Sequence, residues 1–295
     1  MNPPAGWGRT GVEMPALALV TDSTADIPEA EAAQAGVRVV RARSAFEEHA
    51  FSDGELSAGD LYGRMRTEVR APRPFGVPEA AWRVAFDEAL RDSDAVLCLV
   101  MPFDVSPSFT TACAAMLSMD DVPIKILNPG VASAGLCSFV LSLAAGAADG
   151  RDLARALVAV DEIEPLCDTV FVPADVEWLA RAGRLQLIED RIGEIGDGTP
   201  VVRVGTRITG VALAASHQAA IAKAVESAGQ RAGDGTPVIV TIDHADNPDL
   251  AQRFAKMMEA RWNVERVIVT ELSATIGSQL GPGTVGIGVA PVARR

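Results

Sequence analysis

The chain has 295 residues, of which 48% are hydrophobic and 22% are charged, a composition that is typical of globular proteins and sufficient for two domains. Its formal net charge of −13 argues against nucleic acid as a partner and against a general attraction to anionic membranes, because an acidic surface repels phosphate groups. The four cysteines have neither zinc-ligand nor disulfide-framework spacing, and no secretory signal opens the chain. We therefore expect buried free thiols, no metal, no insertion into a membrane and a cytoplasmic location.

The N-terminal half, residues 15–165, is predicted to be an α/β domain with a mainly parallel sheet that is flanked by helices. Residues 1–14 are rich in Pro and Gly and are expected to be a disordered leader. From residue 15 onward, apolar strand patterns alternate with helical patterns, which is typical of such a sheet. The stretch Val131–Ala148 is uncharged but rich in Ala, with three Ser and two Gly. We expect it to be a buried helix that packs against a sheet, because its hydropathy is poor for a membrane span.

The C-terminal half, residues 166–295, is predicted to be a second α/β domain with a mixed sheet. Residues Val201–Leu213 alternate around two glycines, as paired strands do. A glycine-rich strand ends the chain; its glycines precede no helix, so we do not interpret it as a phosphate-binding loop. A ligand cleft is expected between the two domains.

Polar loops follow the C-terminal ends of several predicted strands, the edge of a parallel sheet where ligands sit. These loops hold hydroxyl side chains, among them Ser23, Ser106 and Ser108. Ser106 and Ser108 lie just before a predicted helix, so they could cap that helix or help to bind an anion at its N-terminus. Both interpretations remain open on the sequence alone.

Catalytic motifs are absent from the sequence: it has no HExxH, GxSxG, Walker A lysine or GxGxxG pattern. Asp22 and Asp26 could be paired carboxylates, but we expect Asp22 to order a turn and Asp26 to cap the next helix. His244 followed by Asp246 resembles a strand-end turn more than a catalytic pair. We therefore expect no catalytic residue, no enzymatic activity and no cofactor.

Four segments in order resemble the DegV family, the fatty-acid-binding subunits called FakB in some bacteria. They are VTDSTADIP near the start, DVEWLARAGRL, HADNPDLA and GSQLGPGTVGIG near the end. The resemblance implies two α/β domains with an acyl chain buried between them and a carboxylate head held by hydroxyls and a histidine. In some members a partner kinase phosphorylates the bound acid. Arg184 directly follows Gly183, which we expect to end a helix, so it could be a surface charge or could contact an anion or a partner; we assign it to a partner contact.

The head-group positions differ from the family pattern. Phe75 and Gly76 replace the Thr-Ser pair, Ser106 and Ser108 retain hydroxyls at the second loop, and Gln279 replaces the loop histidine. We expect altered head-group recognition as a result. The predicted ligand-binding residues are Ser23, Phe75, Gly76, Ser106, Ser108, Gln279 and Gly281.

Three functions can be considered, and one of them, an enzyme that acts on a small molecule, is disfavoured because the sequence offers no convincing catalytic group. The other two are binding functions. The first is a carrier that binds a long-chain fatty acid or similar lipid between its domains and presents it to a fatty acid kinase. The alternative is a degenerate family member that serves as a protein-interaction module or binds a different small ligand.

Overall fold

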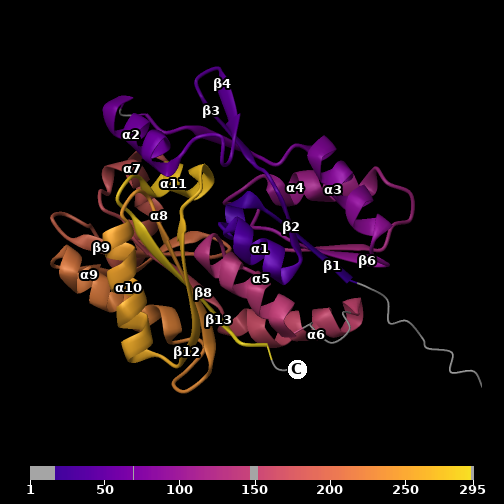
Figure 1. The fold of residues 1–295 in the computed structure, drawn as a ribbon. Helices are drawn as coiled ribbons and strands as arrows, with labels where there is room; N and C mark the ends of the chain where they lie inside the picture. The colour runs from indigo at the N-terminus through magenta and orange to yellow at the C-terminus, as the bar shows by residue number, and fades with distance from the viewer. Residues whose placement is uncertain (1–16, 69, 147–151, 294–295) are drawn as a thin grey trace, which may run out of the picture.

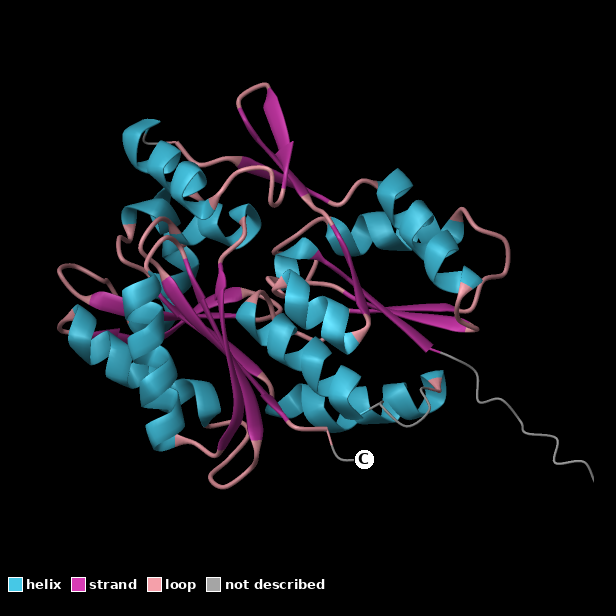
Figure 2. Cartoon of the chain, viewed as in Figure 1, coloured by secondary structure: helices cyan, strands magenta, loops and turns pink. Residues whose placement is uncertain are grey.

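The computed structural model describes residues 17–68, 70–146 and 152–293, so the predicted leader, residues 1–14, lies outside the described part. The fold is α/β with three sheets (Figures 1 and 2). In Figure 1 the elements of the first half, indigo to magenta, lie mostly on one side, and those of the second half, orange to yellow, on the other. The predicted fold class is confirmed.

The first sheet is parallel and four-stranded, in the order β2-β1-β6-β7. Its strands are β1 (Leu17–Asp22), β2 (Val37–Val40), β6 (Ala95–Leu99) and β7 (Ile124–Leu127). Every residue of β6 is buried, as expected of a central parallel strand that is covered on both faces. The helices that connect these strands are α1 (Glu29–Ala35), α3 (Glu79–Arg91) and α4 (Ser108–Leu117), and a short 3-10 turn, η1 (Ser23–Ala25), follows β1.

A small antiparallel sheet, β4-β3-β5, projects from this half of the molecule (Figure 1). Its strands are β3 (Arg43–Phe46), β4 (His49–Ser52) and β5 (Arg73–Gly76), with helix α2 (Ala58–Glu68) inserted before β5. The hydroxyl of Tyr62 on α2 donates a hydrogen bond of 2.6 Å to the carbonyl of Leu272. This contact joins α2 to the C-terminal half.

The second large sheet is mixed and six-stranded, in the order β10-β9-β8-β13-β11-β12. Its strands are β8 (Asp168–Val172), β9 (Thr199–Val204), β10 (Ile208–Ala214), β11 (Val238–His244), β12 (Val264–Glu271) and β13 (Val285–Pro291). Its helices are α7 (Glu177–Arg181), α8 (Leu185–Ile192), α9 (His217–Gly229), α10 (Pro248–Arg261) and α11 (Ala274–Leu280). The predicted strand pair within 201–213 is confirmed as the antiparallel pair β9 and β10, and the glycine-rich final strand is β13.

Helix α5 (Ala134–Gly146) contacts β11 and β13 of the six-stranded sheet although it belongs to the first half of the sequence. All its residues from Ala134 to Ala144 are buried, which confirms the predicted buried helix. Gly288 on β13 permits this packing: a Cβ there would lie 2.0 Å from the carbonyl carbon of Ala134. The missing side chain therefore lets the start of α5 rest directly on the sheet.

The largest hydrophobic cluster contains residues from both halves of the chain, including Leu99, Phe139, Phe171 and Leu280. The strands divide between the two large sheets after β7, while helices α5 and α6 (Leu153–Ile163) and the turn η2 (Glu164–Leu166) lie between β7 and β8 in sequence. We retain a domain boundary near residue 165 as a proposal.

Candidate functional site

A pocket of about 820 Å³, here called the Gln279 pocket, is lined by residues from both halves of the chain. The first half contributes residues of β3 and the turn after it, of β5 and the segment before it, and of the loop before α4. The second half contributes the end of α7, Arg184 and the end of α11. Its lining residues are Ala45, Glu47, Arg70, Ala71, Pro72, Arg73, Pro74, Val105, Arg181, Ala182, Arg184, Ser278 and Gln279.

The charge of this pocket is opposite to that of the whole chain. Four arginines and one glutamate line it, whereas the chain as a whole carries a net charge of −13. Arg70 is paired with Glu47, and the guanidinium of Arg73 lies over the ring of Phe75 at 4.4 Å from its centroid. The local field therefore favours an anionic group, such as a carboxylate, within the pocket.

Arg184 and Gln279, which are 95 positions apart, meet in this pocket. Gly183 ends α7 in the left-handed conformation, with φ of 69°, and Arg184 follows it. The Arg184 Nε donates to Gln279 Oε1 at 3.1 Å, and its Nη2 donates to the carbonyl of Asp104 at 3.2 Å. Gln279 Nε2 donates to the carbonyl of Thr275 at 3.0 Å. Arg184, which the sequence assigned to a partner, is thus held by groups at the pocket wall.

Ser106, Ser108 and Gly76 form a buried group next to this pocket. Ser106 Oγ donates to Ser108 Oγ at 3.2 Å and accepts from the backbone N–H of Ser108 at 3.3 Å. The backbone N–H of Val77 donates to Ser108 Oγ at 3.3 Å. Gly76 has φ of 68°, and a Cβ there would lie 3.0 Å from Ser108 Oγ. The two serines therefore order the start of α4, and Gly76 allows the strand β5 to approach them.

The other three predicted ligand residues do not line the Gln279 pocket. Phe75 is 39% exposed, so its ring is not part of a buried apolar wall. Ser23 lines a different pocket and donates to Asp53 Oδ2 at 2.7 Å. Gly281, with φ of 84°, lies so close to the ring of Trp178 that a Cβ would be 2.1 Å from it. The structure thus brings Gln279 and Arg184 together and places the two serines and Gly76 beside them. Phe75 lies at the edge of the pocket, where its ring contacts Arg73, and Ser23 and Gly281 do not line the pocket.

Asp22, which the sequence predicts to order a turn, is buried near Ser108. Its Oδ1 accepts from the backbone N–H of Thr24 at 3.1 Å, which confirms the turn, while Oδ2 has no hydrogen bond of good geometry. Burial raises the pKa of Asp22, and the nearby hydroxyls of Ser108 and Thr24 oppose the shift.

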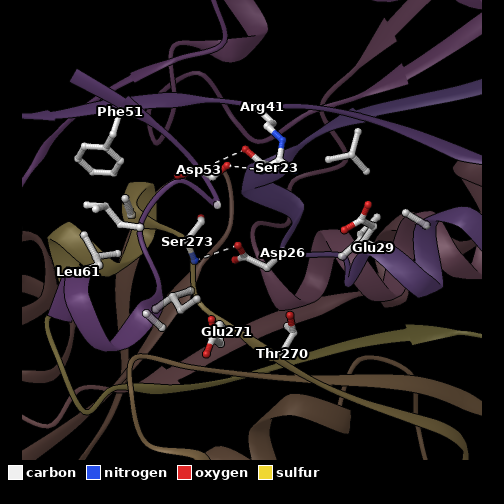
Figure 3. A pocket seen from close by; sticks show the side chains of 18 of the residues that line it. Ser23, Asp26, Glu29, Arg41, Phe51, Asp53, Leu61, Thr270, Glu271 and Ser273 are labelled. Atoms are coloured by element: carbon white, nitrogen blue, oxygen red, sulfur yellow. Dashed lines mark hydrogen bonds between the residues drawn. The ribbon is translucent and has the colours of Figure 1, made fainter. Parts of the chain in front are cut away.

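Asp26 does not cap a helix, contrary to the prediction. Pro28 occupies the N-cap position of α1, and Asp26 instead ends η1 with φ of 52°. Its Oδ1 accepts from the backbone N–H of Ser273 at 2.9 Å (Figure 3). Its Oδ2 is in hydrogen-bond contact with the hydroxyl of Ser133. Ser133 also contacts Asp243 on β11. Asp26 therefore joins the two halves of the chain, a role that no local pattern indicates.

A second pocket, of about 700 Å³, opens beside Asp26 and is shown in Figure 3. Arg41 and Asp53 lie at one side of it, and residues of the segment after β12 lie at the other. Asp53 has its pKa raised to about 6, first by burial and then by the charge of Asp22, against the hydrogen bond from Ser23. We call this pocket the Asp26 pocket.

His244 and Asp246 are each bonded to other groups and not to one another. His244 Nδ1 accepts from the backbone N–H of Asn247 at 3.3 Å, as in a strand-end turn, and Asp246 pairs with Arg66 at 2.6 Å. No group of three or more His, Cys, Asp or Glu side chains in the described part of the chain is arranged to hold a metal ion. None of the described helices combines the length and the hydropathy that a bilayer-spanning segment needs.

The parallel sheet of the first half, the mixed sheet of the second half and the hydrophobic cluster that both halves share define the class of fold as α/β. The model of the DegV family of uncharacterised proteins matches residues 16–292. The chain therefore belongs to the DegV family.

Curated relatives match over almost their full length. A DegV domain-containing protein of Halalkalibacterium halodurans is 24% identical over 277 residues, which covers 93% of this chain and 98% of the relative. One from Streptomyces coelicolor is 27% identical over 278 residues, covering 92% and 97%.

Solved structures agree in fold. A DegV family protein of Thermus thermophilus, described for its fatty acid binding, has a TM-score of 0.85 at 23% identity and covers 94% of this chain and 99% of its own. DegV of Bacillus subtilis, described as a fatty acid binding protein, has a TM-score of 0.83 at 20% identity with the same coverage. These likenesses establish the fold.

Proposed function

We propose that this protein binds a long-chain fatty acid, or a similar lipid with an anionic head, between its two halves and performs no chemistry on it. The observation that carries the proposal is the Gln279 pocket, which is basic in an acidic protein and is lined by both halves. Fatty acid binding by the Thermus thermophilus and Bacillus subtilis structures supports the same ligand class.

The polar end of the proposed site is the pair Arg184 and Gln279. Arg184 supplies a permanent positive charge, and Gln279 fixes the guanidinium by accepting from Nε. A carboxylate that accepts from Arg184 would gain a charge-assisted hydrogen bond of about 1.5–3 kcal/mol. This pair takes the place of the hydroxyl and histidine that the family resemblance implies for the head group.

The acyl tail is proposed to enter the apolar cluster that both halves share behind the pocket. Val105 lines the pocket and belongs to this cluster. Leu280, which follows the pocket residue Gln279, and Leu179, two positions before Arg181, belong to the cluster as well. Each methylene that is buried contributes about 0.8 kcal/mol, so a long tail supplies most of the affinity. The volume of about 820 Å³ is within the range of about 300–1,000 Å³ that small-molecule sites occupy.

A binding titration tests the head-group assignment. The protein, stripped of lipid, is titrated with palmitic acid and with the alcohol of the same length. We expect the acid to bind more tightly than the alcohol. Arg184→Gln should lower the affinity for the acid by about 10- to 100-fold and leave the affinity for the alcohol nearly unchanged. Arg83→Gln, at an exposed position on α3, is the matched control. Equal loss for both ligands, or no loss, would remove Arg184 from the head-group site.

The proposal extends to a protein partner and to the cellular compartment in which the protein acts. We propose that the bound acid is presented to a fatty acid kinase in the cytoplasm, where the three buried thiols Cys98, Cys137 and Cys167 would stay reduced. Incubation of the loaded protein with ATP and a bacterial fatty acid kinase should give acyl phosphate. No acyl phosphate, with a family member of known activity as a positive control, would limit the role to lipid storage.

The alternative is a protein-interaction module, and exposed apolar side chains next to the pocket favour it. Phe103, one residue before Asp104, is 63% exposed, and Phe75 follows the pocket residue Pro74. Under this alternative the stripped protein would bind neither palmitic acid nor its alcohol.

A further inference from the structure

The hydroxyl of Ser133 lies between two buried carboxyl groups that belong to different halves of the chain. Ser133 Oγ is in hydrogen-bond contact with Asp26 Oδ2 and, at 2.5 Å, with Asp243 Oδ2. Asp243 lies on β11, whereas Asp26 follows η1 and Ser133 precedes α5. Ser133 and Asp243 are fully buried and Asp26 is 7% exposed. We call these three residues the Ser133 cluster.

The number of protons in this cluster follows from its geometry. A serine hydroxyl has one proton, so Ser133 can donate to only one of the two carboxylates. The second contact then needs a proton on a carboxyl group, which donates to Ser133 Oγ. Two ionised carboxylates with one proton between them would leave a buried, uncompensated repulsion. The closed arrangement therefore holds two protons and carries one negative charge.

The hydrogen-bond partners indicate where the extra proton sits. Asp243 Oδ2 also accepts from the backbone N–H of Ala134 at 3.0 Å, which favours its ionised form. The pKa of Asp26 is raised well above its ordinary value, first by burial and then by the charge of Asp243. The pKa of Asp243 is raised by burial to about 6, against the hydrogen bonds from Ser133 and Ala134. Asp26 is thus the carboxyl group that holds the proton.

We infer that the Ser133 cluster is a proton-dependent clasp, which holds the two halves closed over the ligand when it is protonated and releases them when it loses its proton. This inference rests on the proposed function, because the clasp acts on the same site. The link is direct: Asp26 accepts from the backbone N–H of Ser273, the N-cap residue of α11, and Gln279 lies on that helix. The two ends of α11 therefore serve the clasp and the pocket.

The surroundings of the cluster intensify its dependence on pH. Most charged groups near the cluster are acidic (Figure 3). The charge of Asp53 raises the pKa of Asp26, the charge of Glu271 raises that of the neighbouring Tyr62, and Glu29 lines the Asp26 pocket. Arg41 is the one basic side chain among the described residues that line this pocket, and its Nη1 donates to the carbonyl of Asp53. The remaining titratable neighbours are Asp22, Tyr62 and Cys137, which are uncharged or acidic. Among the described residues that line this pocket, only Arg41 is basic, and it is already engaged with Asp53, so a second negative charge at Asp26 would lack a cation of its own there.

The Asp26 pocket gives the clasp access to solvent. Asp26 and Ser273 line this pocket of about 700 Å³, so a proton can leave Asp26 without unfolding of the core. The direction of the effect follows from the raised pKa values. The closed state is favoured at low pH, where the carboxyl groups are protonated in both states, and it loses this advantage as pH rises through the pKa of the closed state. For one proton the equilibrium shifts by up to about tenfold per pH unit between the pKa of the open state and the higher pKa of the closed state.

The clasp is tested first without lipid, by urea unfolding of the stripped protein between pH 5.5 and 8.5. Asp26→Asn keeps the acceptor for Ser273 and provides a permanent N–H donor to Ser133, so it imitates the protonated residue. We expect the unfolding constant of the natural protein to rise more steeply with pH than that of Asp26→Asn, by up to about tenfold per unit. Asp87→Asn, at an exposed position on α3, should follow the natural protein. Equal slopes for the natural protein and Asp26→Asn would overturn the inference.

A second measurement links the clasp to the ligand. Protein loaded with palmitic acid is transferred to buffers of pH 6 to 8, and the rate of release to albumin is measured. The natural protein should release its ligand faster as pH rises, whereas Asp26→Asn should not; titration of the free fatty acid is common to both and cancels. A difference in unfolding slope without a difference in release would refute the coupling to the ligand. Failure of either protein to bind palmitic acid would refute the proposed function and leave the unfolding result standing. If Asp26→Asn does not fold, Asp243→Asn removes the charge that helps to raise the pKa of Asp26, so its unfolding constant should also rise less steeply with pH than that of the natural protein; an equal slope would overturn the inference.

Discussion

The contact of α5 with β13 depends on Gly288, and its replacement by Ala gives a sharp test of the fold. A Cβ at Gly288 would lie 2.0 Å from the carbonyl carbon of Ala134 and 2.1 Å from the backbone nitrogen of Gly135. Both atoms belong to the backbone, so no side-chain rotation can relieve the overlap. Overpacking of a core costs about 1–3 kcal/mol and more where the neighbours cannot move. We predict that Gly288→Ala lowers the free energy of unfolding by at least about 3 kcal/mol.

Gly63, within α2, provides the matched control for this substitution. A Cβ at Gly63 would have no neighbour within 4 Å. Alanine is favoured over glycine inside a helix by about 0.5–1 kcal/mol, so Gly63→Ala should stabilise the protein by that amount. Both variants are measured by urea unfolding at one pH. A Gly288→Ala protein within about 0.5 kcal/mol of the natural protein would show that α5 does not rest on β13 as described.

Three further outcomes are expected. Asp168→Ala should lower the free energy of unfolding by about 3 kcal/mol, because Arg203 would lose both its 2.7 Å bonds to a fully buried carboxylate; a change under about 1 kcal/mol in urea unfolding would contradict this. Cys113, which is only partly buried, should react faster with a thiol reagent at pH 8 in the folded protein than the buried Cys98, Cys137 and Cys167, although burial raises the pKa of its thiol as well; labelling of Cys137, whose pKa burial raises to about 12, at the rate of Cys113 would refute its burial. Gln279→Leu should lower the affinity for palmitic acid by about 5- to 10-fold, because it removes the group that orients the Arg184 guanidinium. This loss is smaller than the one expected for Arg184→Gln; an equal or larger loss in a binding titration would show that Gln279 contacts the ligand itself.

The sequence was sufficient to predict the elements whose patterns are local. The apolar run in β6 predicts a buried parallel strand, and the uncharged, Ala-rich segment that becomes α5 predicts a buried helix. The alternation around Gly205 and Gly210 predicts the paired strands β9 and β10. Each of these patterns depends on neighbours within a few residues.

The site depends on contacts between distant residues, which no local pattern encodes. Ser133 meets Asp243 across 110 positions, and Asp26 meets Ser273 across 247. Asp26 was assigned to a helix cap because an acidic residue before a proline is typical of one, but the left-handed backbone at Asp26 turns its side chain toward the other half. The place of Arg184 directly after the helix-ending Gly183 leaves a surface charge, an anion contact and a partner contact open, and nothing near it in the sequence indicates its hydrogen bond to Gln279.

The identity of the bound molecule tests the central claim most directly. The protein is purified from its natural host or a bacterial host without detergent, and its mass is measured under native conditions and again after extraction with organic solvent. We predict one long-chain fatty acid per protein molecule, lost on extraction and regained on addition of palmitic acid. A protein that is empty as purified, and that remains empty in the presence of palmitic acid, would contradict the proposal that this chain is a fatty acid carrier.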